Sequence, residues 1–410
     1  MNDAPNALRT PSRIASRVTR IKPSPSTAAA DRANSLRRAG RSIVNLVVGE
    51  PDFDTPAHIR AAAAAAMERG ATRYTLMAGT VELRQAIAAK LERENGLKYS
   101  IEQIIATNGA KSAIYTALAV TLEPSDEAVI PAPYWVSYPD MVLANEGVPV
   151  TVPCLEANGF KLSPAQLADA ITRRTRWLLI NSPSNPTGAS YTGAEYKALG
   201  KVLLAHPHVL VMTDDIYEHI RFDGGRTPHL LEAVPELRDR VLVVNGVSKT
   251  YAMTGWRIGY AAGPTDIVEA MNTMLSQSSG NCCSISQAAA TEALNGDQSF
   301  VAESVSIYRQ RRDAVLARIN AIAGLSCTPP SGAFYLYVNC AGLVGKTKPD
   351  GGTLTDDGDV VMFLLEQAGV AVVAGTAYGL SPYFRLSIAT SLSVLEDGCA
   401  RIAAAVESLR

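Results

Sequence analysis

One short segment contains two residues whose types and spacing could support cofactor chemistry. The run S-K-T-Y-A-M-T-G-W-R covers residues 248–257 and places Lys249 eight residues before Arg257. A lysine amine can form an imine with an aldehyde, and an arginine can hold a phosphate. This pair suggests pyridoxal 5′-phosphate, a cofactor that carries the electrons while the protein binds and orients it. Taken alone, the spacing also fits two solvated charges on a loop or helix.

Two further segments could hold the phosphate and the ring of such a cofactor. Asn108, Gly109, Ala110 and Lys111 stand between a strand-like run and a helical run. Bare amides at a helix N-terminus bind anions, and Gly109 would let a phosphate approach the backbone. A simple strand-to-helix turn would also explain this glycine. Trp135, in P-A-P-Y-W-V-S-Y-P, could stack on a pyridine ring or could be a core tryptophan.

Three polar side chains could complete the contacts to the ring. Asp214 follows an apolar run, and a carboxylate at the end of a buried strand needs a cationic partner or hydrogen-bond donors. A protonated pyridine nitrogen would serve, and Tyr217 could donate its hydroxyl to the phenolate oxygen of the ring. Asn185, in N-S-P-S-N-P-T-G, is ordinary turn chemistry when considered alone. Together with Ser248, these residues supply every part that one cofactor needs.

Alternating strand-like and helical runs must position these residues. The alternation predicts crossover connections and a mostly parallel sheet with helices on both faces, which is an α/β fold. The strands predicted in this part are Ile104–Thr107, Glu127–Ile130, Val148–Val152, Trp177–Ile180, Val209–Thr213 and Val241–Val244. Because sites in such sheets lie at the carboxyl ends of the strands, we expect the candidate residues to meet there.

The pattern changes near residue 298, which predicts a second domain. A long charged helix at Val301–Ala323 is followed by short strands and two more helices, an α+β arrangement. We therefore expect a large domain at residues 55–297 and a small domain at residues 298–410. Residues 1–54 are expected to join the small domain.

Composition argues against several classes of protein. Of the 410 residues, 47% are hydrophobic and 19% are charged, so the chain can form a large core. A net charge of −1 without a basic stripe argues against a nucleic-acid partner. No apolar run approaches the roughly 18 residues of a membrane helix. Six scattered cysteines without a C-x-x-C pair, and five histidines without metal-ligand spacing, predict a cytoplasmic protein that lacks a metal site.

Over nearly its whole length the sequence resembles the fold-type I class I aminotransferases, and among them the bacterial Iβ aspartate aminotransferases. The matching segments are R-I-K-P-S-P-S, G-E-P-D-F-D-T-P, R-Y-T, N-G-A-K, P-Y-W-V-S-Y-P, N-P-T-G, D-D-I-Y, S-K-T-Y-A-M-T-G-W-R-I-G-Y, S-G-A-F-Y and F-R-L-S-I-A. The resemblance implies a pyridoxal phosphate cofactor, a homodimer, and a large domain with a mostly parallel sheet beside a smaller α+β domain.

The resemblance also implies a role for each candidate residue. Lys249 would bond covalently to the cofactor and later act as a general base, Asp214 would pair with the pyridine nitrogen, and Tyr217 would contact the phenolate oxygen. Further cofactor contacts would come from Gly109, Ala110, Lys111, Trp135, Asn185, Ser248, Arg257 and, across a dimer interface, Tyr74. The substrate would be held by Gly49, Lys111, Trp135, Asn185 and Arg385, of which Arg385 would grip the α-carboxylate as a bidentate fork.

Two positions depart from the pattern of this family. Gly246 stands where the animal and enteric relatives carry a serine, which puts one phosphate contact in doubt. Asp215 stands where many relatives carry glutamate, and its side chain is expected to point away from the ring.

The implied reaction is transamination between an L-amino acid, aspartate or glutamate first, and a 2-oxo acid. Lys111 stands where Iβ relatives bind a distal carboxylate, and Ser26 or Thr27 could add a hydroxyl from a segment that moves as a lid. The alternatives are an aromatic amino acid or prephenate as substrate, or decarboxylation, elimination or oxidation on the same scaffold. A non-enzymatic regulator would need a DNA-binding domain, for which the chain has no room before residue 40.

Overall fold

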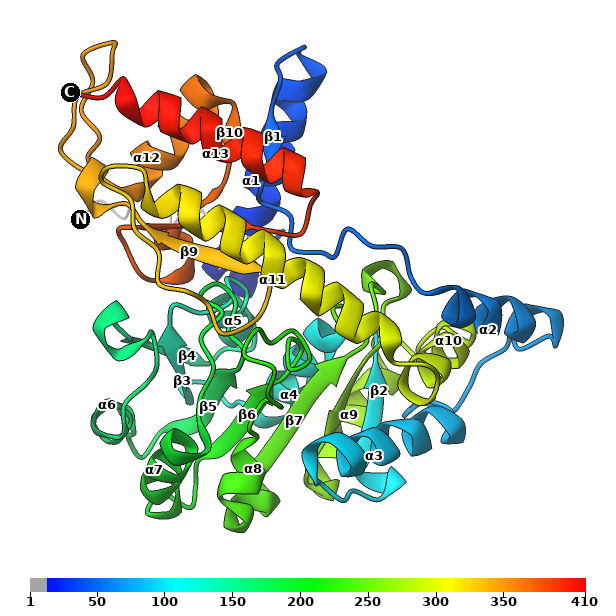
Figure 1. The fold of residues 1–410 in the computed structure, drawn as a ribbon. Helices are drawn as coiled ribbons and strands as arrows, with labels where there is room; N and C mark the ends of the chain where they lie inside the picture. Colours follow the sequence, from blue (N-terminus) through cyan, green and yellow to red (C-terminus); the bar gives the residue numbers. More distant parts are fainter. Residues whose placement is uncertain (1–12) are drawn as a thin grey trace, which may run out of the picture.

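Seven apolar runs form one sheet in the order β2-β8-β7-β6-β5-β3-β4 (Figure 1). The computed structural model describes residues 13–410, and predictions that involve residues 1–12 lie outside this part. The strands are β2 (Ile104–Thr107), β3 (Glu127–Ala132), β4 (Val148–Pro153), β5 (Thr175–Asn181), β6 (Leu210–Asp214), β7 (Val241–Gly246) and β8 (Gly259–Ala262). Neighbours pair in parallel, except that β8 is antiparallel to both β2 and β7. The predicted α/β fold is confirmed.

Both faces of this sheet are covered by helices, because successive residues of each strand point to opposite sides. In β5, Leu178 and Ile180 pack into one buried cluster, while Trp177 and Leu179 pack into another. Helices of the first face are α2 (Ala57–Glu68), α3 (Val81–Asn95), α6 (Pro164–Ala170), α7 (Gly193–Leu204), α8 (Leu230–Ala233) and α10 (Ser284–Asn295). Helices of the second face are α4 (Ala110–Thr121), α5 (Tyr138–Ala144) and α9 (Thr265–Ser276).

A smaller group of strands and helices lies above this sheet in Figure 1. It has a three-stranded sheet in the order β11-β12-β9 and a parallel pair of β1 with β10. Its strands are β1 (Val44–Asn45), β9 (Tyr335–Asn339), β10 (Val370–Ala371), β11 (Val373–Ala374) and β12 (Tyr383–Ser387). Its helices are α1 (Pro25–Arg38), α11 (Ser299–Asn320), α12 (Asp357–Phe363) and α13 (Leu392–Glu407). The domain boundaries near residues 54 and 297 stay a prediction.

Three local features of the chain affect the site. Helix α4 begins at Ala110, so Gly109 is its N-cap. Strand β1 ends at Asn45, and residues 47–50 then line a cavity. Strand β8 was not expected at all, since its sequence G-Y-A-A carries little β-branched character. Its antiparallel return from β7 places the loop 247–258 at the carboxyl end of β7.

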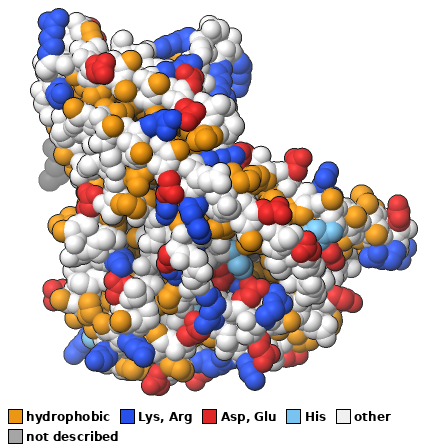
Figure 2. Space-filling view, in the orientation of Figure 1, with side chains coloured by type: hydrophobic (Ala, Val, Ile, Leu, Met, Phe, Trp, Pro, Cys, Tyr) orange, Lys and Arg blue, Asp and Glu red, His pale blue; other side chains and the backbone are white. Residues whose placement is uncertain are grey.

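Acidic and basic side chains are interspersed on the face of the molecule drawn in Figure 2. Among residues 13–410, no helix combines the length and the apolar character needed to cross a membrane.

Candidate active site

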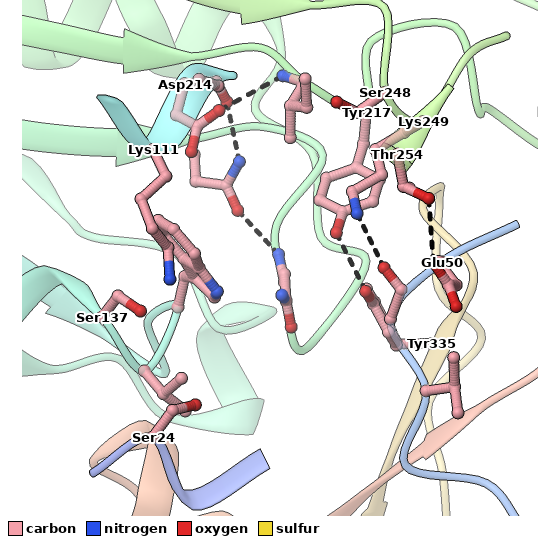
Figure 3. Close-up of a pocket in the computed structure, with 18 of the residues that line it drawn as sticks. Ser24, Glu50, Lys111, Ser137, Asp214, Tyr217, Ser248, Lys249, Thr254 and Tyr335 are labelled. Atoms are coloured by element: carbon pink, nitrogen blue, oxygen red, sulfur yellow. Dashed lines mark hydrogen bonds between the residues drawn. The ribbon is translucent and has the colours of Figure 1, made fainter. Parts of the chain in front are cut away.

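A cavity of about 520 Å³ lies where the carboxyl ends of the central strands face the smaller group (Figure 3). Its lining includes these residues predicted from the sequence: Gly49, Ala110, Lys111, Trp135, Asn185, Asp214, Tyr217, Ser248, Lys249, Arg257 and Arg385. Gly109 directly precedes this lining in the chain, whereas Tyr74 lines a different cavity. Thr27 of α1 also lines the site, and the side chain of Ser26 lies outside the described part.

Lys249 reaches the cavity from the loop between β7 and β8. Its Nζ donates a 2.7 Å hydrogen bond to the carbonyl oxygen of Gly49, and the side chain is half-buried in the wall of the cavity. The pKa of the Lys249 amine is lowered to about 8, mainly by burial and in part by the cations Arg257 and Arg385, while Glu50 and Asp214 oppose the shift. Near neutral pH a useful fraction of this amine is therefore uncharged.

This pKa predicts how the cofactor-free protein takes up pyridoxal phosphate. The neutral amine is the nucleophile, so the rate of covalent attachment should rise about tenfold per pH unit up to about pH 8 and then level off. Stopped-flow absorbance from pH 6 to 9.5 measures this, with Lys249→Ala as the control that attaches nothing. A rate that keeps rising up to pH 10 would show that the lysine is not perturbed.

Asp214 ends β6 and points into the cavity. Its Oδ2 accepts a 2.6 Å hydrogen bond from the hydroxyl of Tyr138, and its Oδ1 lies 3.4 Å from the amide nitrogen of Ile216. Burial raises the pKa of the Asp214 carboxyl to about 6, against the hydrogen bond from Tyr138 that lowers it. Such a carboxyl group would be stabilised as an anion by a cation in the cavity. Tyr138 was not among the predicted site residues, although it lies in the matching segment P-Y-W-V-S-Y-P, three residues after Trp135.

The neighbouring Asp215 is engaged elsewhere. Its Oδ2 accepts a 3.0 Å hydrogen bond from the hydroxyl of Thr213 and lies 3.2 Å from Nε2 of His229. The side chain thus points away from the cavity, as expected, because adjacent strand residues face opposite sides.

An anion cradle forms where Arg257 meets the N-terminus of α4. Gly109 has a φ of +85°, and a Cβ atom there would lie 2.4 Å from Nη2 of Arg257. Nη1 of the same guanidinium donates a 2.8 Å hydrogen bond to the carbonyl oxygen of Thr254. The positive end of the helix and the arginine therefore converge with Ser248 on one place, a combination that suits a phosphate.

Gly246 shows why the serine of some relatives is missing from this cradle. A Cβ atom at this position would lie 2.9 Å from the carbonyl oxygen of Ile258 and 3.0 Å from Cα of Gly259. The close pairing of β7 with β8 therefore leaves no room for a side chain, and Ser248 is the hydroxyl that lines the cavity nearby.

Two tyrosines meet on the side of the cavity opposite Asp214 in Figure 3. The hydroxyls of Tyr217 and Tyr335 are joined by a 2.9 Å hydrogen bond. Tyr217 is a predicted site residue, whereas Tyr335 had no predicted role, although it ends the matching segment S-G-A-F-Y. Asn185 is held nearby by Asn181, whose Oδ1 accepts a 2.7 Å hydrogen bond from the Asn185 amide.

Arg385 on β12 is a buried cation at the end of the cavity, with only 3% of its surface exposed. Nη1 donates to Oδ1 of Asn185 at 3.1 Å, and Nη2 donates to the carbonyl oxygen of Val47 at 2.5 Å. Its Nε is buried without a hydrogen-bond partner among the described residues. Buried donors are normally satisfied, so this guanidinium is set up to receive an anionic ligand such as a carboxylate.

A second cation, Lys111, stands in the same cavity. Its Nζ lies 4.8 Å from the centre of the Trp135 ring, which itself lines the cavity. Burial lowers the pKa of the Lys111 amine, and the nearby charge of Arg257 lowers it further. An anion bound beside Lys111 would stabilise the charged form of the amine and so raise its pKa.

A cluster of Glu94, Glu218 and His219 has the composition of a cation site, but a lysine already fills it. The ammonium of Lys90 is hydrogen-bonded to Glu218 and lies 3.5 Å from Oε2 of Glu94. This fully buried ammonium supplies the positive charge that the carboxylates need.

The sheet, the lysine in the cavity and the anion cradle are together typical of the fold-type I class of pyridoxal-phosphate enzymes. Residues 41–402 match the family "Aminotransferase class I and II". The aspartate/prephenate aminotransferase of Cereibacter sphaeroides is 53% identical over 94% of this chain and 97% of its own length. The chain belongs to this aminotransferase family.

Solved structures agree with this assignment. The aspartate aminotransferase of Rhizobium meliloti superposes with a TM-score of 0.96 at 48% identity, over 98% of this chain and 100% of that one. The aspartate aminotransferase of Thermus thermophilus with maleate gives 0.90 at 40% identity, over 96% and 100% of the two chains.

Pyridoxal phosphate is the cofactor of this family, and the residues present fit it. The amine of Lys249 suits its aldehyde, and the carboxylate of Asp214 suits a protonated pyridine nitrogen. Because Gly109 has no side chain, the guanidinium of Arg257 can lie against the N-terminus of α4 and form the anion cradle.

Proposed function

We propose that this enzyme transfers an amino group between aspartate or glutamate and a 2-oxo acid. The observation that carries the proposal is that two buried or half-buried cations, Arg385 and Lys111, line one cavity with Lys249. A dicarboxylate could place its α-carboxylate on Arg385 and its distal carboxylate near Lys111. The Thermus thermophilus relative was solved with maleate, which is also a dicarboxylate.

The residues of this chain would bind the reactants and move one proton. The chemistry that bound pyridoxal phosphate supplies is stabilisation of the negative charge left on the substrate Cα when its proton leaves. Arg385 orients the substrate through its carboxylate. The uncharged Nζ of Lys249 accepts the Cα proton and holds it, and its pKa of about 8 suits that task. Asp214 supplies the fixed negative charge opposite a pyridine nitrogen.

Product analysis tests this reaction against its alternatives. Aspartate incubated with 2-oxoglutarate and the holoenzyme should give oxaloacetate and glutamate in equal amounts. Alanine as the product would indicate decarboxylation instead, free ammonia would indicate elimination, and hydrogen peroxide would indicate oxidation. Any of these as the main product would contradict the proposal.

A second candidate substrate is prephenate or an aromatic amino acid. Ile114, Val136 and the Trp135 ring add apolar surface to the cavity that contains Lys111. A ring could pack on this surface while a carboxylate stays near the lysine. The Cereibacter sphaeroides relative is named for both aspartate and prephenate. A panel of amino donors and prephenate, compared by kcat/KM, decides between the two.

Replacement of Lys111 by methionine should separate dicarboxylates from other substrates. The variant keeps the length of the side chain and loses its charge, so KM for aspartate and 2-oxoglutarate should rise about 10- to 100-fold. KM for alanine or phenylalanine, which lack a distal carboxylate, should change less than about threefold. Steady-state kinetics on both kinds of donor measures this. An equal rise for both kinds would assign Lys111 to the cofactor alone.

We also propose a homodimer in which Tyr74 reaches the neighbouring site. Tyr74 is 97% exposed in one chain, and Met67, Leu76 and Val81, which are close to it in the sequence, are also exposed. Exposed large apolar side chains are consistent with a protein partner that would cover them. A single-chain mass in analytical ultracentrifugation at micromolar concentration would contradict this proposal.

The cytoplasmic location stays a prediction. All six cysteines are free, and only Cys283 is exposed, which suits a reducing compartment.

A further inference from the structure

Tyr335 contacts two functional side chains that come from different parts of the molecule. It lies on β9, in the smaller group of strands, and is almost completely buried. Its hydroxyl is hydrogen-bonded at 2.9 Å to the hydroxyl of Tyr217, which follows β6 of the large sheet (Figure 3). Tyr335 therefore bridges the two groups of strands inside the cavity.

The ring of Tyr335 also supports the cation at the end of the cavity. Strands β9 and β12 are antiparallel, with Tyr337 directly opposite Arg385 and Tyr335 diagonal to it on the same face. The guanidinium carbon of Arg385 lies 4.3 Å from the centre of the Tyr335 ring, which is a cation–π contact. One side chain thus holds Arg385 through its ring and Tyr217 through its hydroxyl.

The count of hydrogens shows what the hydroxyl of Tyr335 can do. Each phenol has one hydrogen to donate. If Tyr335 donates to Tyr217, the hydrogen of Tyr217 stays available for an acceptor in the cavity. Gly49 lies close to the Tyr335 hydroxyl, since a Cβ atom on Gly49 would be 2.8 Å from that oxygen, and the carbonyl oxygen of Gly49 receives the hydrogen bond of Lys249. A hydrogen bond donated by the Tyr335 hydroxyl would polarise the Tyr217 hydroxyl and make Tyr217 a stronger donor.

We propose that Tyr335 is a positioning residue that orients the Tyr217 hydroxyl toward the phenolate oxygen of the cofactor and the Arg385 guanidinium toward the substrate carboxylate. The proposal rests on the roles assigned above to Tyr217 and Arg385. It makes one residue of the smaller group responsible both for tuning the cofactor and for binding the substrate.

Tyr335→Phe removes the hydroxyl and keeps the ring. A weaker donor to the phenolate oxygen disfavours the form in which this oxygen is anionic. The pH midpoint at which the bound cofactor changes its visible absorbance should therefore rise by about half a unit to one unit. KM for aspartate should stay within about twofold. Tyr335→Leu removes the ring as well, so KM for aspartate and 2-oxoglutarate should also rise about five- to twentyfold.

Tyr337→Phe is the matched control. Tyr337 lies on the same face of β9, but its hydroxyl donates to the carbonyl oxygen of Leu380 rather than to Tyr217. This holoenzyme should keep the wild-type midpoint and KM, and thermal unfolding of all variants shows whether packing is intact. A Tyr335→Phe enzyme that titrates like the wild type, or a Tyr337→Phe enzyme with the same shift, would overturn the role of Tyr335. A wild-type protein that binds no pyridoxal phosphate would overturn the proposed function with it.

Discussion

Replacement of Lys249 by alanine is expected to abolish covalent attachment of the cofactor and to lower kcat by roughly 10⁴-fold, the upper range for loss of a general base. The Lys249 amine lies in the cavity, where it donates a hydrogen bond to the carbonyl oxygen of Gly49 and has a pKa of about 8. Borohydride treatment of the holoenzyme followed by peptide mass spectrometry measures attachment, and a coupled assay measures kcat.

Lys111 provides the control for this experiment, since it lines the same cavity and its pKa is also lowered by burial. Lys111→Met should retain the borohydride-trapped adduct on the peptide that contains residue 249. An adduct on residue 111, or near-normal turnover by Lys249→Ala, would remove the basis of the mechanism.

Replacement of Asp214 by asparagine is expected to lower kcat about 10²- to 10⁴-fold. Breaking a buried ion pair by removal of one partner costs about 3–5 kcal/mol, and the carboxylate would pair with the pyridinium nitrogen. Asparagine keeps the shape and can still accept the hydrogen bond from Tyr138, so the fold should survive. Steady-state kcat with saturating cofactor, together with the dissociation constant of the cofactor, measures the effect.

Asp215→Asn is the matched control, because its carboxylate is adjacent in the chain but contacts Thr213 and His229. This variant should lose some thermal stability while its kcat changes less than about threefold. Equal losses of kcat in both variants would mean that the effect comes from packing at the end of β6 rather than from a charge in the cavity.

The residues predicted from the sequence share a physical property. Asp214, Ser248 and Lys249 each follow an apolar run, and the strand ends of a parallel sheet bring such residues together whatever the details of packing. Their chemical types then restrict the ligand, because few ligands suit a lysine in a cavity wall, a buried carboxylate and an arginine beside a helix N-terminus at the same time.

Other parts of the site depend on contacts between residues far apart in the chain. Tyr138 and Asp214 are 76 residues apart, and Tyr217 and Tyr335 are 118 apart. No periodicity or local motif contains such a pairing. Strand β8 was not predicted for a related reason. Its four residues form a strand because they pair with β2 and β7, and their own strand preference is weak.

The sequence by itself determined the α/β fold, because its strand-like and helical runs alternate. It also predicted the lysine, the carboxylate and the anion cradle as parts of one site, because each lies at the end of a single strand. Only the tertiary structure decided which side chains support them. It placed Tyr138 on Asp214 and Tyr335 between Tyr217 and Arg385, and it left Tyr74 on the outer surface of one chain. These contacts arise where separate elements pack, and packing is a property of the whole fold rather than of any segment.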